Sequence, residues 1–255
     1  MENRLEFWES RADLGYKAGS NDSILKALEI NEIKKYLSDD LKVLEIGCGN
    51  GITAIELARS FSLDILSVDY SSKMIENAKI LLKNETYGNL KGNIKFEVLD
   101  IRNLTKITQK YDMVISERVL INLDTYKEQI KTINTIGSIL KPKGKFIMCE
   151  SSKKGLDLIN NERSKFQLDL IEMPWHNNYI DDDKLERDFN KINLNLKSIN
   201  HFSSTYYFLS RIVYAHYANQ NNLKIDYESD INKMSSKLPS LGKFSQTKIW
   251  EWERL

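Results

Sequence analysis

Short apolar runs alternate with amphipathic segments through the first 150 residues of the chain. The apolar runs are rich in valine, isoleucine and leucine, which is typical of strands buried on both faces of a sheet. Because helix-like segments separate the runs, we expect βαβ units, a parallel sheet and right-handed crossovers. The predicted strands cover residues 42–47, 64–69, 94–99, 111–116 and 145–150.

The segments between these strands place apolar residues at i, i+3 and i+4, the period of a helix with one buried face. LKPKG at residues 140–144 is typical of a helix end before the fifth strand. The predicted helices cover residues 51–61, 71–84 and 124–141.

The pattern changes after Glu150. Residues 151–192 indicate a helix, a loop and a second helix, and residues 203–243 are mainly helical. Residues 193–202 and 244–255 alternate like strands. The second half has too few strands for a sheet of its own. We therefore expect the whole chain to form one α/β domain, in which these strands complete the sheet and the additions cover one edge.

A glycine-rich turn follows the first strand, in the stretch VLEIGCGNG from Val43 to Gly51. Glycine is needed where φ is positive or where a ligand lies against the main chain, and the following helix N-terminus offers unpaired N–H groups. A tight turn alone would also explain the glycines. The dinucleotide-binding fingerprint GxGxxG would place its third glycine at Ile52, so the spacing disfavours a nicotinamide-dependent oxidoreductase, which we keep as an alternative.

Two acidic residues end later strands, at the edge where parallel sheets bind ligands. Asp69 follows Gly47 by 22 residues and can accept hydrogen bonds from ribose hydroxyls. Asp100 ends the third strand and can meet the exocyclic amine of an adenine. Either acid could instead cap a helix, although Ser71 and Ser72 are available for that role beside Asp69.

With these features in this order, residues 41–150 resemble the class I, Rossmann-like S-adenosylmethionine-dependent methyltransferases. The similar motifs are VLEIGCGNG, VDYS, VLDI, YDMVISERVLINL and GSILKPKGKFIMCE. The resemblance implies a seven-stranded sheet with helices on both faces and an antiparallel last strand. The implied division is residues 1–40 closing the cofactor pocket, 41–150 as the cofactor-binding core, 151–192 and 203–243 as a helical cap on the acceptor side, and 193–202 and 244–255 as strands six and seven.

The resemblance also implies cofactor-binding roles by position. It places the ribose hydroxyls at Asp69 and the aminoacyl group near Ser116 and Glu117. Residues of the first helix would close the pocket, while an amphipathic helix that packs on the core is the alternative explanation for them. The other implied positions are Trp8, Arg11 and Tyr16 for closure, Glu45, Gly47, Cys48, Gly49 and Gly51 for the turn, and Tyr70, Met74, Asp100 and Ile101 for the adenine.

Methyl transfer from a sulfonium mainly requires alignment of acceptor, methyl and sulfur, and only some acceptors need a base. His176 in MPWHNNY is the base candidate and Tyr179 the second, while an exposed or capping loop position is the alternative for His176. Arg118 and Arg211 are candidates for holding an anionic acceptor. The alternatives are an ion pair with a neighbouring acid for Arg118 and core packing among tyrosines for Arg211.

The overall charge is balanced, with 37 lysines and arginines against 36 acidic residues and a net charge of +1. We therefore expect neither nucleic acid nor membrane as a partner, and no apolar stretch approaches the roughly 20 residues of a membrane-spanning helix. The two distant cysteines, Cys48 and Cys149, predict neither a disulfide nor a metal site. We expect a cytoplasmic monomer or homodimer.

The expected acceptor is a small molecule that carries a hydroxyl or an anionic, phosphorylated or sugar-related group. ERVLINL, PWHN and SSTYYFLSR also resemble methyltransferases encoded in bacterial clusters for capsular polysaccharide modification. A protein acceptor and a non-catalytic S-adenosylmethionine-binding module stay open as alternatives. SERV stands where DNA amino-methylating enzymes carry (N/D)PP(Y/F).

Overall fold

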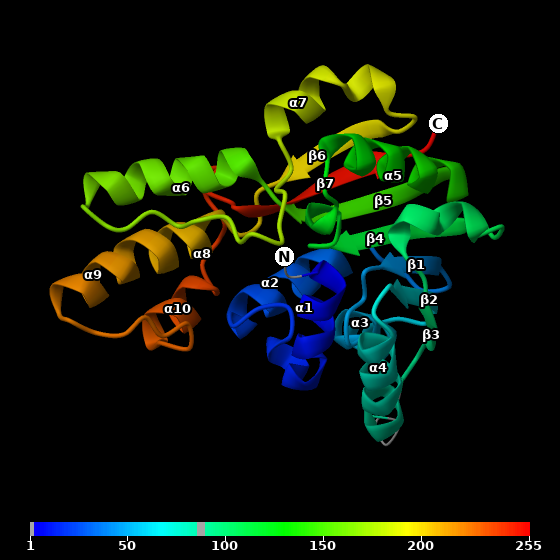
Figure 1. The fold of residues 1–255 in the computed structure, drawn as a ribbon, viewed down its shortest axis with the longest axis horizontal. Coiled ribbons are helices and arrows are strands. Elements are labelled where there is room, and N and C mark those ends of the chain that lie inside the picture. Colours follow the sequence, from blue (N-terminus) through cyan, green and yellow to red (C-terminus); the bar gives the residue numbers. More distant parts are fainter. Residues whose placement is uncertain (1–2, 86–89) are drawn as a thin grey trace.

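A seven-stranded sheet runs through the part of the chain that the structure describes, residues 3–85 and 90–255 (Figure 1). Its strands are β1 (Lys42–Ile46), β2 (Asp64–Asp69), β3 (Asn93–Val98), β4 (Tyr111–Glu117), β5 (Leu140–Ser151), β6 (Asn195–Asn200) and β7 (Thr247–Glu253). The order in this computed structural model is β3-β2-β1-β4-β5-β7-β6. β7 is antiparallel to its neighbours β5 and β6, as predicted, and the other pairs are parallel.

Alternation along β1 divides the core between the two faces of the sheet. Val43 belongs to one apolar cluster, whereas Leu44 and Ile46 belong to another, and all three are fully buried. The neighbouring strands and the helices supply the rest of each cluster, because each helix turns its apolar stripe to the sheet. The helices beside Val43 are α2 (Ser23–Lys34), α3 (Ile52–Ser60) and α4 (Ser72–Glu85), and those on the other face are α5 (Tyr126–Ile139) and α7 (Asp182–Arg187).

The predicted strand positions agree with β1 to β4 to within one residue at each end. β5 begins at Leu140, earlier than expected, because Leu140 pairs with Tyr111 before a bulge in the β4–β5 ladder. Short 3₁₀ turns also lie between the longer helices and strands. These turns are η1 (Ala12–Lys17), η2 (Ile101–Lys106), η3 (Leu120–Asn122) and η4 (Phe189–Lys191).

The helical additions lie beyond one end of the central strands (Figure 1). Within residues 203–243, expected to be mainly helical, a π-helical turn, η5 (Leu209–Val213), lies between two α-helices. The other elements here are α6 (Lys153–Lys165), α8 (Ser204–Phe208), α9 (Tyr214–Gln220) and α10 (Asp230–Ser235), while α1 (Arg4–Arg11) begins the described chain. Within the described ranges, no helix combines the length and the apolar character needed to cross a bilayer.

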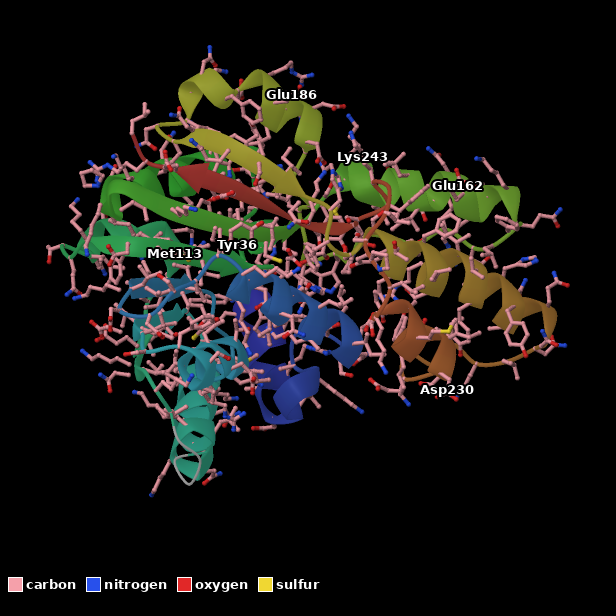
Figure 2. All side chains as sticks on the ribbon, turned by 180° about the vertical axis from the view of Figure 1, so that it is seen from behind. Tyr36, Met113, Glu162, Glu186, Asp230 and Lys243 are labelled. Atoms are coloured by element: carbon pink, nitrogen blue, oxygen red, sulfur yellow. The ribbon has the colours of Figure 1, made fainter. Side chains whose placement is uncertain are left out.

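Side chains fill the space between the sheet and its helices. Seen from behind, Met113 lies within this packing at 2% exposure, whereas Glu186 lies on the outer surface of α7 (Figure 2). Phe202 and Ile249, from the last two strand regions, join the cluster on the α2 face. The second half of the chain therefore completes the same core, as the sequence predicts.

Candidate active site

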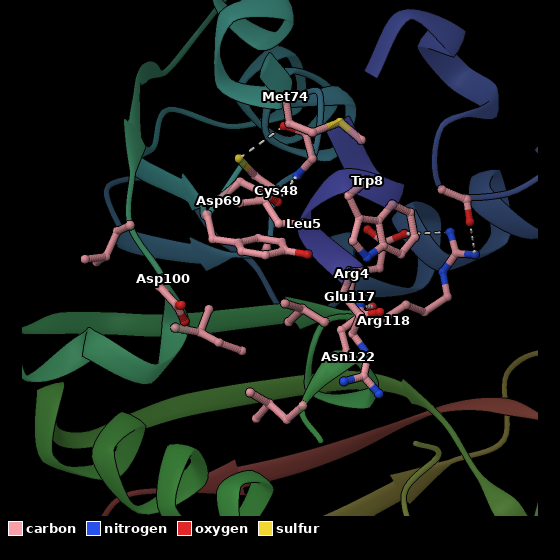
Figure 3. Close-up of a pocket in the computed structure, with 18 of the residues that line it drawn as sticks. Arg4, Leu5, Trp8, Cys48, Asp69, Met74, Asp100, Glu117, Arg118 and Asn122 are labelled. Atoms are coloured by element: carbon pink, nitrogen blue, oxygen red, sulfur yellow. Dashed lines mark hydrogen bonds and ion pairs between the residues drawn. The ribbon is translucent and has the colours of Figure 1, made fainter. Parts of the chain in front are cut away.

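A cavity of about 1030 Å³ lies where the carboxyl ends of β1, β2 and β4 meet the N-terminal helices (Figure 3). Ligands of open α/β sheets bind at this edge. The lining residues that the sequence predicted are Trp8, Gly47, Cys48, Gly49, Asp69, Tyr70, Met74, Asp100, Ile101, Glu117 and Arg118. Further lining residues include Arg4, Ser20, Lys26, Asn50, Asn122 and Trp175.

The three glycines of the turn are required for different reasons. All have positive φ, from 53° at Gly49 to 79° at Gly51. A Cβ atom on Gly49 would meet nothing within 4 Å, so this glycine leaves the cavity open. A Cβ on Gly51 would lie 2.5 Å from the ring of Phe96, and one on Gly47 would overlap Val119. Packing therefore requires Gly47 and Gly51, and Gly51 does not line the cavity.

The Asp69 carboxylate is fixed at the cavity wall by two backbone donors. One oxygen accepts from Gly49 N–H and the other from Ser71 N–H, both at 2.9 Å. The start of α4 is capped instead by Ser71, whose Oγ accepts from Met74 N–H at 3.2 Å. Burial raises the pKa of Asp69. Because a carboxylate offers about four lone-pair positions, Asp69 retains acceptor capacity toward a ligand.

Asp100 faces the same cavity but has a strong partner. Its carboxylate accepts from Arg102 Nη2 at 2.5 Å, from Arg102 Nε at 2.9 and 3.0 Å, and from the Arg102 backbone N–H at 2.9 Å. Burial opposes ionisation, but the bonds from Arg102 outweigh it and lower the pKa of Asp100. Asp100 thus caps η2 as well as lining the cavity, so both sequence interpretations apply to it.

Charged residues cluster at the end of β4, where Arg118 lies 3.9 Å from Glu117, the neighbouring acid of the ion-pair alternative, whereas Lys26 and Glu29 were not predicted to join them. Lys26 Nζ lies 2.5 Å from Glu117 Oε1, and Thr53 Oγ1 donates to the other Glu117 oxygen at 2.7 Å. Beside them, Arg118 Nη2 lies 3.2 Å from Glu29 Oε2. Burial opposes the ionisation of both acids. At Glu117 the positive charges of Lys26 and Arg118 outweigh burial and lower the pKa. At Glu29 burial outweighs the charge of Arg118 and raises the pKa.

The loop after β4 is held by another buried acid, Glu150. Its carboxylate accepts from the N–H groups of Val119 at 3.2 Å, Leu120 at 3.0 Å and Ile121 at 3.4 Å. Burial raises the pKa of Glu150 to about 7. Arg118, which precedes these donors, adopts a φ of 55° that residues other than glycine rarely take. The loop is therefore fixed in one conformation at the cavity wall.

The first helix covers the cavity by contacts with the loop around residue 175. Arg4 Nε donates to the His176 carbonyl at 2.8 Å, and Arg4 also pairs with Asp124. The rings of Phe7 and His176 stack with centroids 4.2 Å apart. Trp175, from the loop, lines the cavity along with Trp8 of the helix.

Arg11 does not line the cavity, contrary to the role in closure predicted for it. Its guanidinium donates to the carbonyls of Ala18 at 2.6 Å and Lys17 at 2.8 Å, so it closes the turn η1. The side chain of Tyr16, also predicted to close the pocket, lies outside the described part of the structure.

Neither of the two base candidates lines the cavity. His176 is not among the cavity residues, and burial together with the Arg11 and Arg4 charges lowers its pKa to about 4. Tyr179 is 5% exposed, and its hydroxyl accepts from Gln246 Nε2 at 3.0 Å. The sequence predicted that these residues face the acceptor, whereas the structure packs both of them outside the cavity lining.

Arg211 also lies apart from the cavity. Its guanidinium lies 2.5 Å from Asp22 and is packed over the ring of Tyr227 at 4.3 Å. The hydroxyl of Tyr206 donates to the same aspartate at 2.7 Å. The core-packing alternative describes this position, because Asp22 neutralises the arginine that was expected to hold an anion.

Glu45 and Ser116 are likewise buried behind the cavity rather than in its lining. Glu45 accepts from Ser67 Oγ at 2.8 Å, and burial raises its pKa to about 8. Glu45 lies within β1, two residues before Gly47, and its burial makes it a core acid, in contrast to the ligand-lining role implied by the motif.

A sheet in this order, a glycine turn after β1 and a buried aspartate at the end of β2 together define the class I methyltransferase fold. The sequence model of the methyltransferase-domain family matches residues 37–186, more than half of the chain. The chain belongs to this family, which confirms the family predicted from the motifs.

Curated relatives match about half of the chain. It is 29% identical over 140 residues to EEF1A lysine methyltransferase 2 of Homo sapiens, covering 53% of this chain and 57% of that protein. It is 32% identical over 126 residues to a demethylmenaquinone methyltransferase of Leptospira interrogans, covering 49% of this chain and 48% of that protein. The chain thus spans about half the length of these relatives.

Solved structures share the fold over nearly the full chain. The CcbJ methyltransferase from Streptomyces caelestis is 15% identical, with 99% of both chains covered and a TM-score of 0.65. Magnesium protoporphyrin IX methyltransferase from Synechocystis PCC 6803, solved with bound SAH, is 16% identical, with 96% of this chain and 94% of that chain covered and a TM-score of 0.58. These likenesses confirm the predicted Rossmann-like architecture.

Proposed function

We propose that the chain transfers the methyl group of S-adenosylmethionine to a small-molecule acceptor. When bound, this cofactor supplies a methyl group already activated by a positively charged sulfur. The residues of the cavity fit such a molecule. Gly49 leaves room beside the main chain, Asp69 keeps free acceptor positions, and Tyr70, Met74 and Ile101 give an apolar wall suited to an adenine.

Each part of the cavity has a task in this proposal. Asp69 accepts hydrogen bonds from the ribose hydroxyls, and the hydrogen bond that it accepts from Gly49 N–H keeps the glycine turn in place. Ser20, Lys26 and Glu117 line the end nearest α2, where opposite charges suit the ammonium and carboxylate of an amino acid. Trp8 and Trp175 exclude water from the side covered by α1.

The observation that carries a small-molecule acceptor is the cover formed by α1. Arg4 bonds to both Asp124 and the His176 carbonyl, so the helix and the loop close over the cavity together. Ligand pockets of about 300–1,000 Å³ hold drug-sized molecules, and the 1030 Å³ here would accommodate the cofactor and one metabolite. A cavity partly covered in this way suits a metabolite better than the surface of a folded protein.

Catalysis rests on positioning in this proposal. Among the described residues that line the cavity there is no histidine, and its carboxylates are hydrogen-bonded or ion-paired. Alignment of two bound reactants can lower a barrier by about 7–11 kcal/mol in favourable cases. The geometry therefore favours in-line transfer without a base supplied by His176.

Calorimetric titration with S-adenosylhomocysteine tests the cofactor site. The wild type should bind it and should not bind NAD. Asp69→Asn should weaken binding by about 10- to 100-fold, the scale of a lost charge-assisted hydrogen bond. Asp39→Asn changes the same charge outside the cavity and should leave affinity unchanged. Equal affinity of the Asp69 variant would remove the ribose assignment.

A protein acceptor is the second candidate, because the relative from Homo sapiens is a lysine methyltransferase. Cell extract incubated with the enzyme and methyl-labelled S-adenosylmethionine separates the two candidates. Label in the fraction that passes a small-pore filter supports a metabolite acceptor, and label retained with extract proteins contradicts it. The link to capsule modification stays a prediction.

A further inference from the structure

Trp175 presents a large apolar ring that stays accessible at the cavity wall. It lines the cavity and is 52% exposed, whereas Trp250 and Trp252 are buried at 1% and 0%. Aromatic rings contribute most when other apolar groups cover them, and ligand pockets are lined mainly by such side chains. An indole left open on this wall is therefore a contact surface for a molecule that fills the cavity.

The turn that carries Trp175 is fixed before any ligand arrives. Asn177 N–H donates to the Pro174 carbonyl at 2.9 Å, which closes the turn. The His176 carbonyl accepts from Arg4 Nε at 2.8 Å, which joins the turn to α1. A contact surface held in this way loses little conformational freedom on binding, so its contacts add to affinity.

Aromatic rings connect Trp175 to the cofactor side of the cover. Trp8 packs with Met74, a residue expected beside the adenine, and both lie at the cavity in Figure 3. The centroid of the Phe7 ring lies 5.1 Å from that of Trp8 and 5.6 Å from that of Trp175, and Phe7 meets both indoles edge-on. Trp8 is thus the indole at the Met74 end of this wall. Trp175 belongs to residues 151–192, which we expect on the acceptor side.

We infer that Trp175 holds a planar, aromatic body of the acceptor. This inference rests on the proposed methyltransferase function and adds the chemical class of the acceptor to it. A flat ring can lie offset or edge-on against the indole, and such pairs gain affinity beyond the apolar area that they bury. A saturated body of the same size buries a similar area without this gain.

The charges of the cavity disfavour a cation at this position. An indole face also attracts cations, so a positively charged ligand is the alternative to an aromatic one. Among the described residues, five basic and four acidic side chains line the cavity. A bound cofactor adds the positive charge of its sulfur, so a cationic acceptor would meet an excess of like charge. An aromatic body without a positive charge fits better.

Matched probes test this contact on the full chain saturated with S-adenosylhomocysteine. 2-Naphthol and decahydro-2-naphthol carry the same hydroxyl on a flat and on a puckered body, and ligand-observed NMR titration gives each dissociation constant. We expect 2-naphthol to bind about three- to tenfold more tightly. Equal binding, or no binding of 2-naphthol up to its solubility limit, overturns the inference. Tighter binding of tetramethylammonium than of 2-naphthol would assign the indole to a cation and would also overturn it.

Two substitutions connect this preference to the indole. Trp175→Leu keeps an apolar side chain without a ring and should bring 2-naphthol to the affinity of the saturated probe. Trp175→Phe keeps a flat ring and should retain the preference. Tyr217→Leu removes an aromatic ring of similar exposure, 50%, from α9 outside the cavity lining, and should change neither affinity. A preference that persists in Trp175→Leu contradicts the inference.

Titration with S-adenosylhomocysteine distinguishes this inference from the proposed function. A wild type that does not bind S-adenosylhomocysteine removes the proposed function, and the inference with it. If the wild type binds but Trp175→Leu weakens that binding more than about threefold, Trp175 serves the cofactor and only the acceptor assignment is wrong. Unchanged cofactor affinity with loss of the preference for 2-naphthol supports the inference.

Discussion

The ammonium nitrogen of Lys26 lies 2.5 Å from a carboxylate oxygen of Glu117, although 91 residues separate them in the sequence. The contact joins α2 to the end of β4 at the cavity wall. Glu117 is nearly inaccessible, with its side chain 4% exposed, so its charge depends on this partner. The N-terminal helices are therefore connected to the sheet by charge as well as by apolar packing.

Replacing this lysine should destabilise the fold. Lys26→Met leaves Glu117 beside Glu29 with only Arg118 to compensate, and we expect a loss of about 2–3 kcal/mol in the free energy of unfolding. Urea denaturation measures the change. Lys35→Met, which removes an exposed pair with Glu32, is the matched control and should cost less than about 0.5 kcal/mol. Equal losses in the two variants would contradict a structural role for the buried pair.

The glycines of the turn should separate ligand binding from stability. Gly51→Ala places a Cβ atom 2.5 Å from the Phe96 ring and should lower stability by about 2–4 kcal/mol. Gly49→Ala meets no protein atom and should cost only about 1 kcal/mol for its positive φ, while S-adenosylhomocysteine affinity falls at least tenfold. Thermal unfolding and calorimetry on both variants check this order, and the reverse order would place the cofactor elsewhere.

Glu45 predicts a dependence of stability on pH. Burial raises its pKa from 4.5 to about 8, so the folded state holds a proton that the unfolded state releases. Above pH 4.5 the unfolded state binds fewer protons, and stability should fall as the pH rises toward 8. Glu45→Gln cannot ionise and should be more stable than the wild type by about 2–4 kcal/mol at pH 8 but not at pH 4.5. Urea titrations at both pH values measure this difference. Glu186→Gln, on the surface, is the control, and its stability relative to the wild type should be the same at pH 8 and pH 4.5.

Arg211 should affect stability rather than acceptor affinity. Arg211→Met leaves Asp22 buried at 3% exposure without its cation, and a loss of about 3 kcal/mol is expected. Arg187→Met, at an exposed position of α7, should change stability by less than about 0.5 kcal/mol. A stable Arg211 variant with a raised acceptor KM would instead restore the anion-holding role that the sequence first indicated.

The cofactor side of the site could be predicted because its residues are local in the sequence. Gly49 lies in the turn that follows β1 and Asp69 ends β2, so hydrophobic periodicity places both at one edge of the sheet. Lys26 and Glu29 required knowledge of where α2 packs. One signal was available, since Glu29 shares a helical stripe with Leu25 and Ile33, all buried in the structure. An acid on such a stripe predicts a buried partner.

The contact between α1 and the loop around residue 175 could not be predicted in the same way. Arg4 and His176 are 172 residues apart, and nothing in either neighbourhood encodes their contact. Histidine at neutral pH suits a base, but the aromatic rings and arginines that surround His176 come from α1 and shift its pKa away from that role. Such surroundings depend on tertiary packing, which sequence periodicity does not report.

The place of β7 in the sheet has a consequence for how the protein is made. Among the described residues, β6 pairs only with β7, and β7 separates β6 from β5. While the ribosome is still synthesising the chain, β6 has no partner, and this edge of β5 is unpaired until β7 emerges. Trp250 and Trp252 of β7 are almost fully buried in the finished fold. Nascent chains should therefore expose unpaired strand edges and an apolar surface to chaperones until residue 253 has emerged, so this half of the sheet assembles later than the half around β1.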